Sequence, residues 1–177
     1  LGYIPTLNNV SDGIRIPVGS DNSDPVMGLS GFGTYALIGK WNGLYILYGQ
    51  NCANFQVQPV NGTRGCRAKK SWVVCDTFVL YLADDGIYRF DGSASIKISK
   101  QIEASLTKYF ASSQGNSDWL NAQAVYINRK YVINIGLDTY VYDFDANGGQ
   151  GDWTYCLWGV SAAQYINDTY GLTLGGY

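Results

Sequence analysis

The residues with the clearest potential for chemistry lie in one glycine-rich segment, DFDANGGQGDW. Asp143, Asp145 and Asn147 alternate along it and a glycine takes the sixth position, as in the first half of a calcium-binding loop. The twelfth position holds a threonine where such a loop has its bidentate glutamate, although Asp152 could close a loop flanked by strands. The segment therefore predicts either a Ca²⁺ site formed by Asp143, Asp145, Asn147 and Asp152, or a glycine-rich turn between two aromatic strands.

A short basic run is the second candidate site. It consists of Arg64, Arg67, Lys69 and Lys70. Such a cluster can bind DNA, contact an acidic neighbouring subunit, or lie in a solvated loop. The chain carries a net charge of −2, which argues against nucleic-acid binding by the domain, and we expect no sequence-specific binding. The four residues are expected to form either a subunit contact or a bare surface loop.

No set of residues predicts catalysis, and Ca²⁺ is the one cofactor that the sequence suggests. The chain has no histidine, which excludes Ser-His and Cys-His nucleophilic catalysis and mixed Cys/His metal sites. Its acidic residues are 13 aspartates and one glutamate, and most of the aspartates stand beside glycine or at expected turns, where a backbone role explains them. The four cysteines include no CxxC pair, and those in strands are expected to be buried thiols. We therefore predict that the protein is not an enzyme.

The elements that would position these residues are strands. Three segments place aromatic and aliphatic residues on either side of a short turn: LYILYG, FVLYLADDGIYRFDG and YVINIGLDTYVYDFDANG. This repeated pattern predicts an all-β fold of antiparallel meanders, with units at residues 34–60, 71–99 and 122–166 and the start of another at 168–177. An interval of roughly 40–55 residues is typical of four-stranded propeller blades. A partial or small β-propeller is the expected architecture, and a β-sandwich is the alternative.

Two regions depart from this pattern. Ser99 is a suitable N-cap, and apolar residues follow it at helical spacing, which predicts a short amphipathic helix near residues 99–110. Residues 1–31 are rich in turn formers and predict an irregular arm or linker, so the propeller-like domain is expected at 32–177. The chain stops inside an apparent strand, and we expect it to be a piece of a longer protein. No segment has the length and apolar character of a membrane span.

The middle unit carries a family resemblance. A glycine turn at Gly65 leads to a strand at Ser71–Val74, and the order continues through Val79–Leu82, Asp85–Gly92 and the start of the helix at Ile98–Ser99. In this order of elements, the stretch from residue 62 to residue 106 resembles proteins of tailed bacteriophages that complete the head or form the tail nozzle. Proteins of that family are built on a β-propeller.

The resemblance implies a structural protein of the virion, assembled in the host cytoplasm. It implies a homo-oligomeric ring in the neck or tail, surrounding the channel for DNA ejection and contacting portal, neck or other tail proteins. An alternative comes from the many tyrosines, since tyrosine is enriched at protein interfaces and at sugar-binding faces. In that alternative the chain is an extracellular or tail-tip propeller module that binds carbohydrate receptors.

Overall fold

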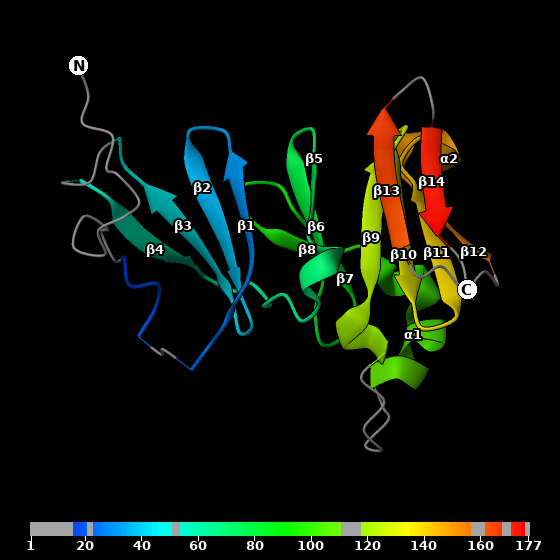
Figure 1. The fold of residues 1–177 in the computed structure, drawn as a ribbon, viewed down its shortest axis with the longest axis horizontal. Helices are drawn as coiled ribbons and strands as arrows, with labels where there is room; N and C mark the ends of the chain where they lie inside the picture. The colour runs from blue at the N-terminus through cyan, green and yellow to red at the C-terminus, as the bar shows by residue number, and fades with distance from the viewer. Residues whose placement is uncertain are drawn as a thin grey trace.

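The computed structural model describes residues 16–20, 23–50, 54–110 and 118–156, together with the backbone of 162–167 and 171–175. These residues form three four-stranded antiparallel sheets and one two-stranded sheet (Figure 1). In each four-stranded sheet the strands lie side by side in chain order. The prediction of an all-β fold made of repeated antiparallel meanders is therefore confirmed. The described sheets form no closed barrel, and the propeller remains a prediction.

The first sheet consists of β1 (Val26–Phe32), β2 (Tyr35–Lys40), β3 (Leu44–Tyr48) and β4 (Gln56–Val60). The second consists of β5 (Val73–Cys75), β6 (Phe78–Leu82), β7 (Ile87–Phe90) and β8 (Ser95–Lys97). The third consists of β9 (Gln123–Ile127), β10 (Lys130–Ile135), β11 (Asp138–Asp143) and β12 (Asp152–Cys156). The two-stranded sheet pairs β13 (Ala162–Asn167) with β14 (Gly171–Gly175).

The turns between strands follow from local backbone chemistry. Asn128 and Arg129 connect β9 to β10 with φ angles of 47° and 58°. Two left-handed residues in a row make the turn type that matches the twist of a hairpin. The next turn lies at Gly136–Leu137, because Gly136 supplies a φ of 62° and Asp138 already pairs with Ile135.

The three sheets stack face to face, as the blue, green and yellow layers of Figure 1 show. Strand β6 lies in the middle layer, and its side chains alternate between two cores. Val79 and Tyr81 pack toward the first sheet, whereas Leu80 and Leu82 pack toward the third. All four side chains are fully buried. The middle sheet is thus covered on both faces, which explains the nearly continuous apolar run in this segment.

Trp72 fills the space between the first and second sheets. Its indole ring lies against Gly28 of β1 and Gly39 of β2, where added Cβ atoms would stand 2.2 and 2.4 Å from ring atoms. Its Nε1 donates a hydrogen bond of 3.3 Å to Ser30 Oγ. The first sheet therefore needs glycine at these two positions to accept the ring.

Strand β9 contacts both β5 and β13. The first strands of successive sheets thus lie next to each other, and the second and third sheets meet along them. Larger side chains fill the rest of that interface, namely the aromatic residues Phe78, Tyr126, Tyr142, Phe144 and Trp153.

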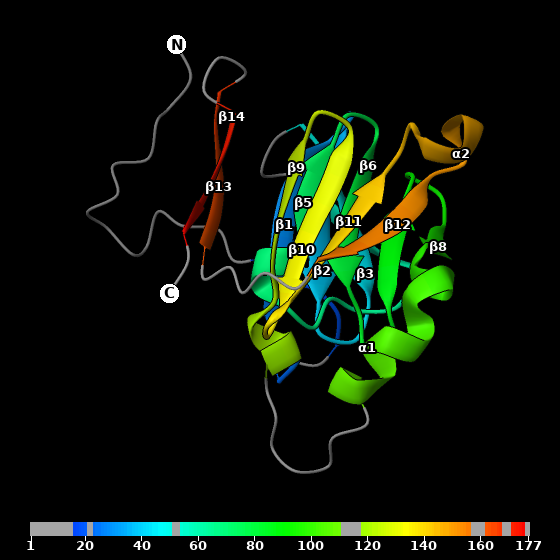
Figure 2. The same cartoon turned by 90° about the vertical axis from the view of Figure 1, so that its right-hand side faces the viewer.

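The expected helix is present. A 3₁₀ turn, η3 (Ser99–Ile102), leads into α1 (Glu103–Phe110) at one end of the stacked sheets (Figure 2). The N-cap position belongs to Ile98, and Ser99 is the first residue of η3; the Oγ of the fully buried Ser99 accepts a bond of 3.0 Å from the amide of Ile87. The other short helices are η2 (Lys69–Ser71), η4 (Asp118–Asn121) and α2 (Ala146–Gly149). Within the described part of the chain, no helix is both long and apolar enough to traverse a bilayer.

The N-terminal boundary differs from expectation. Residues 26–31, expected within an irregular arm, belong to β1, because pairing with β2 stabilises a glycine-rich segment whose own pattern is weak. The segment before β1 also packs on the sheet: the buried Lys40 donates a hydrogen bond of 2.7 Å to the carbonyl of Val18. Residues 1–15 lie outside the described residues. At the other boundary, the third sheet ends at Cys156, and residues 162–166 belong to the two-stranded sheet.

Candidate functional site

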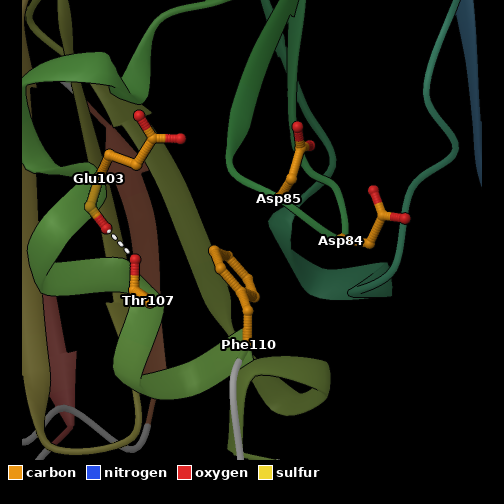
Figure 3. A pocket seen from close by; sticks show the side chains of 5 residues that line it. All are labelled: Asp84, Asp85, Glu103, Thr107 and Phe110. Atoms are coloured by element: carbon orange, nitrogen blue, oxygen red, sulfur yellow. Dashed lines mark hydrogen bonds between the residues drawn. The ribbon is translucent and has the colours of Figure 1, made fainter.

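A hollow lies between the β6–β7 turn and α1. Its volume is about 300 Å³, and it is lined by Asp84, Asp85, Glu103, Thr107 and Phe110 (Figure 3). The two aspartates come from the turn and the other three residues from the helix. The hollow thus joins two elements that the sequence predicted separately.

The turn side of the hollow is held against the start of the helix. The amide of Ala83 donates a hydrogen bond of 2.8 Å to the carbonyl of Gly86, which closes the turn. A Cβ at Gly86 would lie 2.4 Å from Ser99 Oγ and 2.6 Å from Lys97 Cε, so only glycine permits this approach. Because Ser99 also accepts the amide of Ile87, the turn and the helix have a fixed relative position.

The helix side presents one carboxylate, one hydroxyl and one aromatic ring. Thr107 Oγ1 donates a hydrogen bond of 2.8 Å to the carbonyl of Glu103, shown as the dashed line in Figure 3. Phe110 packs edge-on against Trp119, with 5.5 Å between the ring centroids. Its ring lies between the helix and the Asp84–Asp85 turn in Figure 3.

Two residues of the predicted basic cluster lie beside the hollow. Arg64 contacts Asp84 and Asp85 at 3.6 and 3.8 Å, and Arg67 contacts Asp84 at 3.4 Å. The guanidinium of Arg67 also lies over the ring of Trp41, 4.5 Å from its centroid. These contacts give both arginines partners within the chain. The sequence predicts instead that both arginines face a partner subunit or solvent.

A third cation, Lys97, was not predicted from the sequence. Its Nζ donates a hydrogen bond of 2.6 Å to Glu103 and lies 3.7 Å from Asp85. Burial lowers the pKa of Lys97, but the bond to Glu103 and the charge of Asp85 raise it more, so the net shift is upward. Tyr88 donates a hydrogen bond of 3.0 Å to Asp85, and its pKa is raised by burial and by this carboxylate. The hollow therefore has an ammonium donor and a neutral phenol beside its carboxylates at neutral pH.

The other half of the basic cluster remains exposed. Lys69 and Lys70 are the first two residues of η2, and neither has an ion pair within the described ranges. Ser71, the last residue of η2, is fully buried; its Oγ accepts the amide of Leu82 at 2.9 Å. Its carbonyl accepts the hydroxyl of Tyr131 at 3.1 Å. The two lysines thus stand on a segment that is anchored to the second and third sheets.

The predicted calcium ligands lie at the end of the third sheet. Asp143 ends β11, Asp152 begins β12, and these two residues are paired across the strands. Asp143 accepts hydrogen bonds from Lys130 and from the amide of Asp145. The hydrogen bond from Lys130 is the main cause of the lowered pKa of Asp143.

The rest of that loop has the conformation of a glycine-rich turn. Asn147 and Gly148 have left-handed φ angles of 52° and 68°, and Asp145 accepts a hydrogen bond of 2.7 Å from Arg129. No group of three or more metal-ligating Cys, Asp or Glu side chains occurs among the described residues. The Ca²⁺ site stays a prediction, and a calcium ion would have to displace Lys130 and Arg129.

Asp138 was not among the residues predicted from the sequence to form a site. Its side chain is 5% exposed and contacts Lys108, which is about half exposed. It also accepts hydrogen bonds of 2.6, 3.3 and 2.8 Å from the hydroxyls of Tyr109, Tyr140 and Tyr155. Burial raises the pKa of Asp138, but the bonds from Lys108 and the tyrosines lower it more, so the net shift is downward. This cluster fastens α1 to the third sheet, and its members come from α1, β11 and β12, which are separated along the chain.

The described cysteines are free thiols. Cys66 and Cys75 are buried, and burial raises their pKa values to about 11 and about 12. Thiols with such pKa values are poor nucleophiles at neutral pH. Cys52 lies outside the described residues.

Comparison of the sequence with models of known protein families gave no match, and comparison with curated proteins gave none either.

Proposed function

We propose that the chain is a structural, non-enzymatic component of a tailed-phage virion, forming part of a homo-oligomeric ring in the neck or tail around the DNA channel. The observation that carries the proposal is the position of the stretch with the family resemblance. Residues 73–97 of that stretch form the middle sheet, which packs on both neighbouring sheets. The resemblance thus concerns the segment on which the whole stack is built.

The regular repetition of the sheets supports the propeller. Each sheet is a four-stranded meander in chain order, and β9 contacts the first strands of both neighbouring sheets. This arrangement is the one that successive blades adopt around a common axis. In a phage ring, such blades would belong to subunits that contact portal, neck or other tail proteins.

The surface of β1 supports self-association. Among the described strands β1 pairs with β2 alone, which leaves its other edge without a strand partner in this part of the chain. Val26 and Leu29 on this strand are 49% and 66% exposed. A free edge with exposed aliphatic residues favours pairing with another chain.

Of the four residues in the basic cluster, only Lys69 and Lys70 are proposed to contact another subunit. Arg64 and Arg67 have acidic partners in the chain, whereas the two lysines are exposed on an anchored segment. The partner surface is expected to be acidic, since two ammonium groups attract carboxylates across an interface.

The proposal is tested by locating the protein and measuring its assembly. Antibodies raised against the chain should label the neck or tail of purified virions in immuno-electron microscopy. Light scattering of the purified protein should show a closed oligomer. A protein that stays monomeric at high concentration and is absent from mature particles would refute the proposal.

Charge-reversal variants test the contact residues. Lys69→Glu and Lys70→Glu should weaken assembly about tenfold each. Lys100→Glu, a matched change at an exposed lysine of η3, should leave assembly unchanged. Equal effects at all three positions would show that net charge, and not a contact at η2, controls assembly.

A further inference from the structure

The hollow between the β6–β7 turn and α1 has no role in the proposed ring. Its volume of about 300 Å³ lies at the lower end of the range for ligand pockets, roughly 300–1,000 Å³, which suits one small ring-shaped molecule. Its position is fixed by the close approach of Gly86 to Ser99, so little ordering is needed when a ligand binds.

The charges around the hollow indicate which class of ligand it can bind. The three carboxylates of Asp84, Asp85 and Glu103 are each in contact with a cation. The three cations are Arg64, Arg67 and Lys97. With three charges of each sign, the site has no net attraction for a free anion or cation. It offers hydrogen-bond acceptors and donors next to one another instead.

A neutral ring with several hydroxyl groups can form hydrogen bonds with both the acceptors and the donors of such a site. Each hydroxyl group can donate to a carboxylate and accept from a guanidinium or ammonium group. The side chains of Asp84 and Asp85 are both 38% exposed, although Oδ1 of Asp85 is itself buried and has no hydrogen-bond partner among the described residues. The partly buried Phe110 supplies an aromatic ring for the apolar C–H face of a sugar.

We propose that this hollow binds a single pyranose unit of a glycan. The carboxylates of the β6–β7 turn and Glu103 accept hydrogen bonds from its hydroxyls, the neighbouring cations donate to them, and Phe110 packs against the ring. This inference gives the carbohydrate-binding alternative a defined location. It does not depend on assembly of the ring, because none of the hollow's lining residues lies in β1 or η2.

The test measures binding of defined sugars to the purified full chain. The probes are the methyl glycosides of glucose, galactose, mannose and N-acetylglucosamine, followed by saturation-transfer NMR at millimolar concentration. At least one of them should bind with a dissociation constant on the order of 1 mM, since one sugar ring offers few contacts. Absence of transfer to all four glycosides would overturn the proposal.

Variants locate the binding. Thr107→Arg, at an exposed helix position, fills the hollow and should reduce the affinity at least tenfold while the fold is retained. Asp85→Asn should weaken binding about tenfold through loss of a charged acceptor. Asp145→Asn is the control, because Asp145 is likewise an aspartate paired with an arginine but does not line the hollow, and it should change the affinity less than twofold. Binding that survives Thr107→Arg, or that falls equally in Asp145→Asn, would overturn the proposal.

Discussion

Replacement of Gly39 by alanine tests how the first two sheets are joined. A Cβ at this position would lie 2.4 Å from Cζ3 of Trp72, well inside van der Waals contact, so the indole must move. The ring cannot move freely, because Gly28 lies against its other part and Ser30 accepts its Nε1 hydrogen bond. Overpacking of this kind costs about 1–3 kcal/mol. For a chain of 177 residues, each kcal/mol lowers the melting temperature by about 2–4 °C.

The measurement is urea unfolding followed by far-ultraviolet circular dichroism, with Gly31→Ala as the matched control. Gly31 lies on β1, and a Cβ there meets nothing within 4 Å. We expect Gly31→Ala to be neutral or stabilising by up to about 1 kcal/mol, because alanine costs less conformational entropy than glycine in a strand. The difference between the two glycine variants isolates the contact with the ring.

A double-mutant cycle with Trp72→Ala decides the mechanism. If the ring causes the penalty, Gly39→Ala should cost nothing once Trp72 has been truncated. The coupling free energy should then be about 1–3 kcal/mol, the size measured for residues in direct contact. An equal cost of Gly39→Ala in both backgrounds would refute the reasoning, as would an equal effect of Gly31→Ala.

Three further predictions concern buried and charged groups. Asp138→Asn should lower the free energy of unfolding by about 2 kcal/mol at pH 7. Because the folded pKa of Asp138 is below its unfolded value, the difference from the wild type should shrink as the pH falls below about 4. A pH-independent difference in urea unfolding would contradict this. Millimolar Ca²⁺ should leave the melting temperature unchanged, because Arg129 already holds Asp145; a rise that Asp145→Asn abolishes would instead support the calcium loop. Cys66 and Cys75 should react with a thiol reagent only after denaturant is added, and fast labelling of either residue in the native protein would show that the sheets open locally.

Local chemistry explains why so much of the fold could be predicted. Strand β10 alternates between inward and outward residues, and the Asn128–Arg129 turn has residues that tolerate left-handed angles. Where such a local signal was weak, the prediction was wrong: β1 contains glycines at positions 28 and 31, and its pairing with β2 stabilises it. Glycine is needed at position 28 because the indole ring of Trp72 packs against it. A local sequence pattern does not reveal such a contact between residues far apart in the chain.

The candidate sites likewise combine features that the local sequence predicts with features that depend on contacts between distant residues. The sequence identified Arg64, Arg67, Lys69 and Lys70 as one cluster because they are close along the chain. Folding separates them, since the Asp84–Asp85 turn approaches the arginines and leaves the lysines exposed. Residues close in sequence lie on the same surface only where the backbone between them does not change direction. Here the loop and η2 change its direction, so the arginines and the lysines lie on different parts of the surface.

The sequence by itself determined most of the strands and turns, the helix near residues 99–110 and the absence of histidine chemistry, because these depend on residue type and on spacing along the chain. The tertiary structure decided which strands share a core, how Asp138 gathers three tyrosines, and that a hollow lies where α1 meets the β6–β7 turn. Those features depend on contacts between residues far apart in the chain. Such contacts follow from the packing of whole layers, which no local pattern encodes.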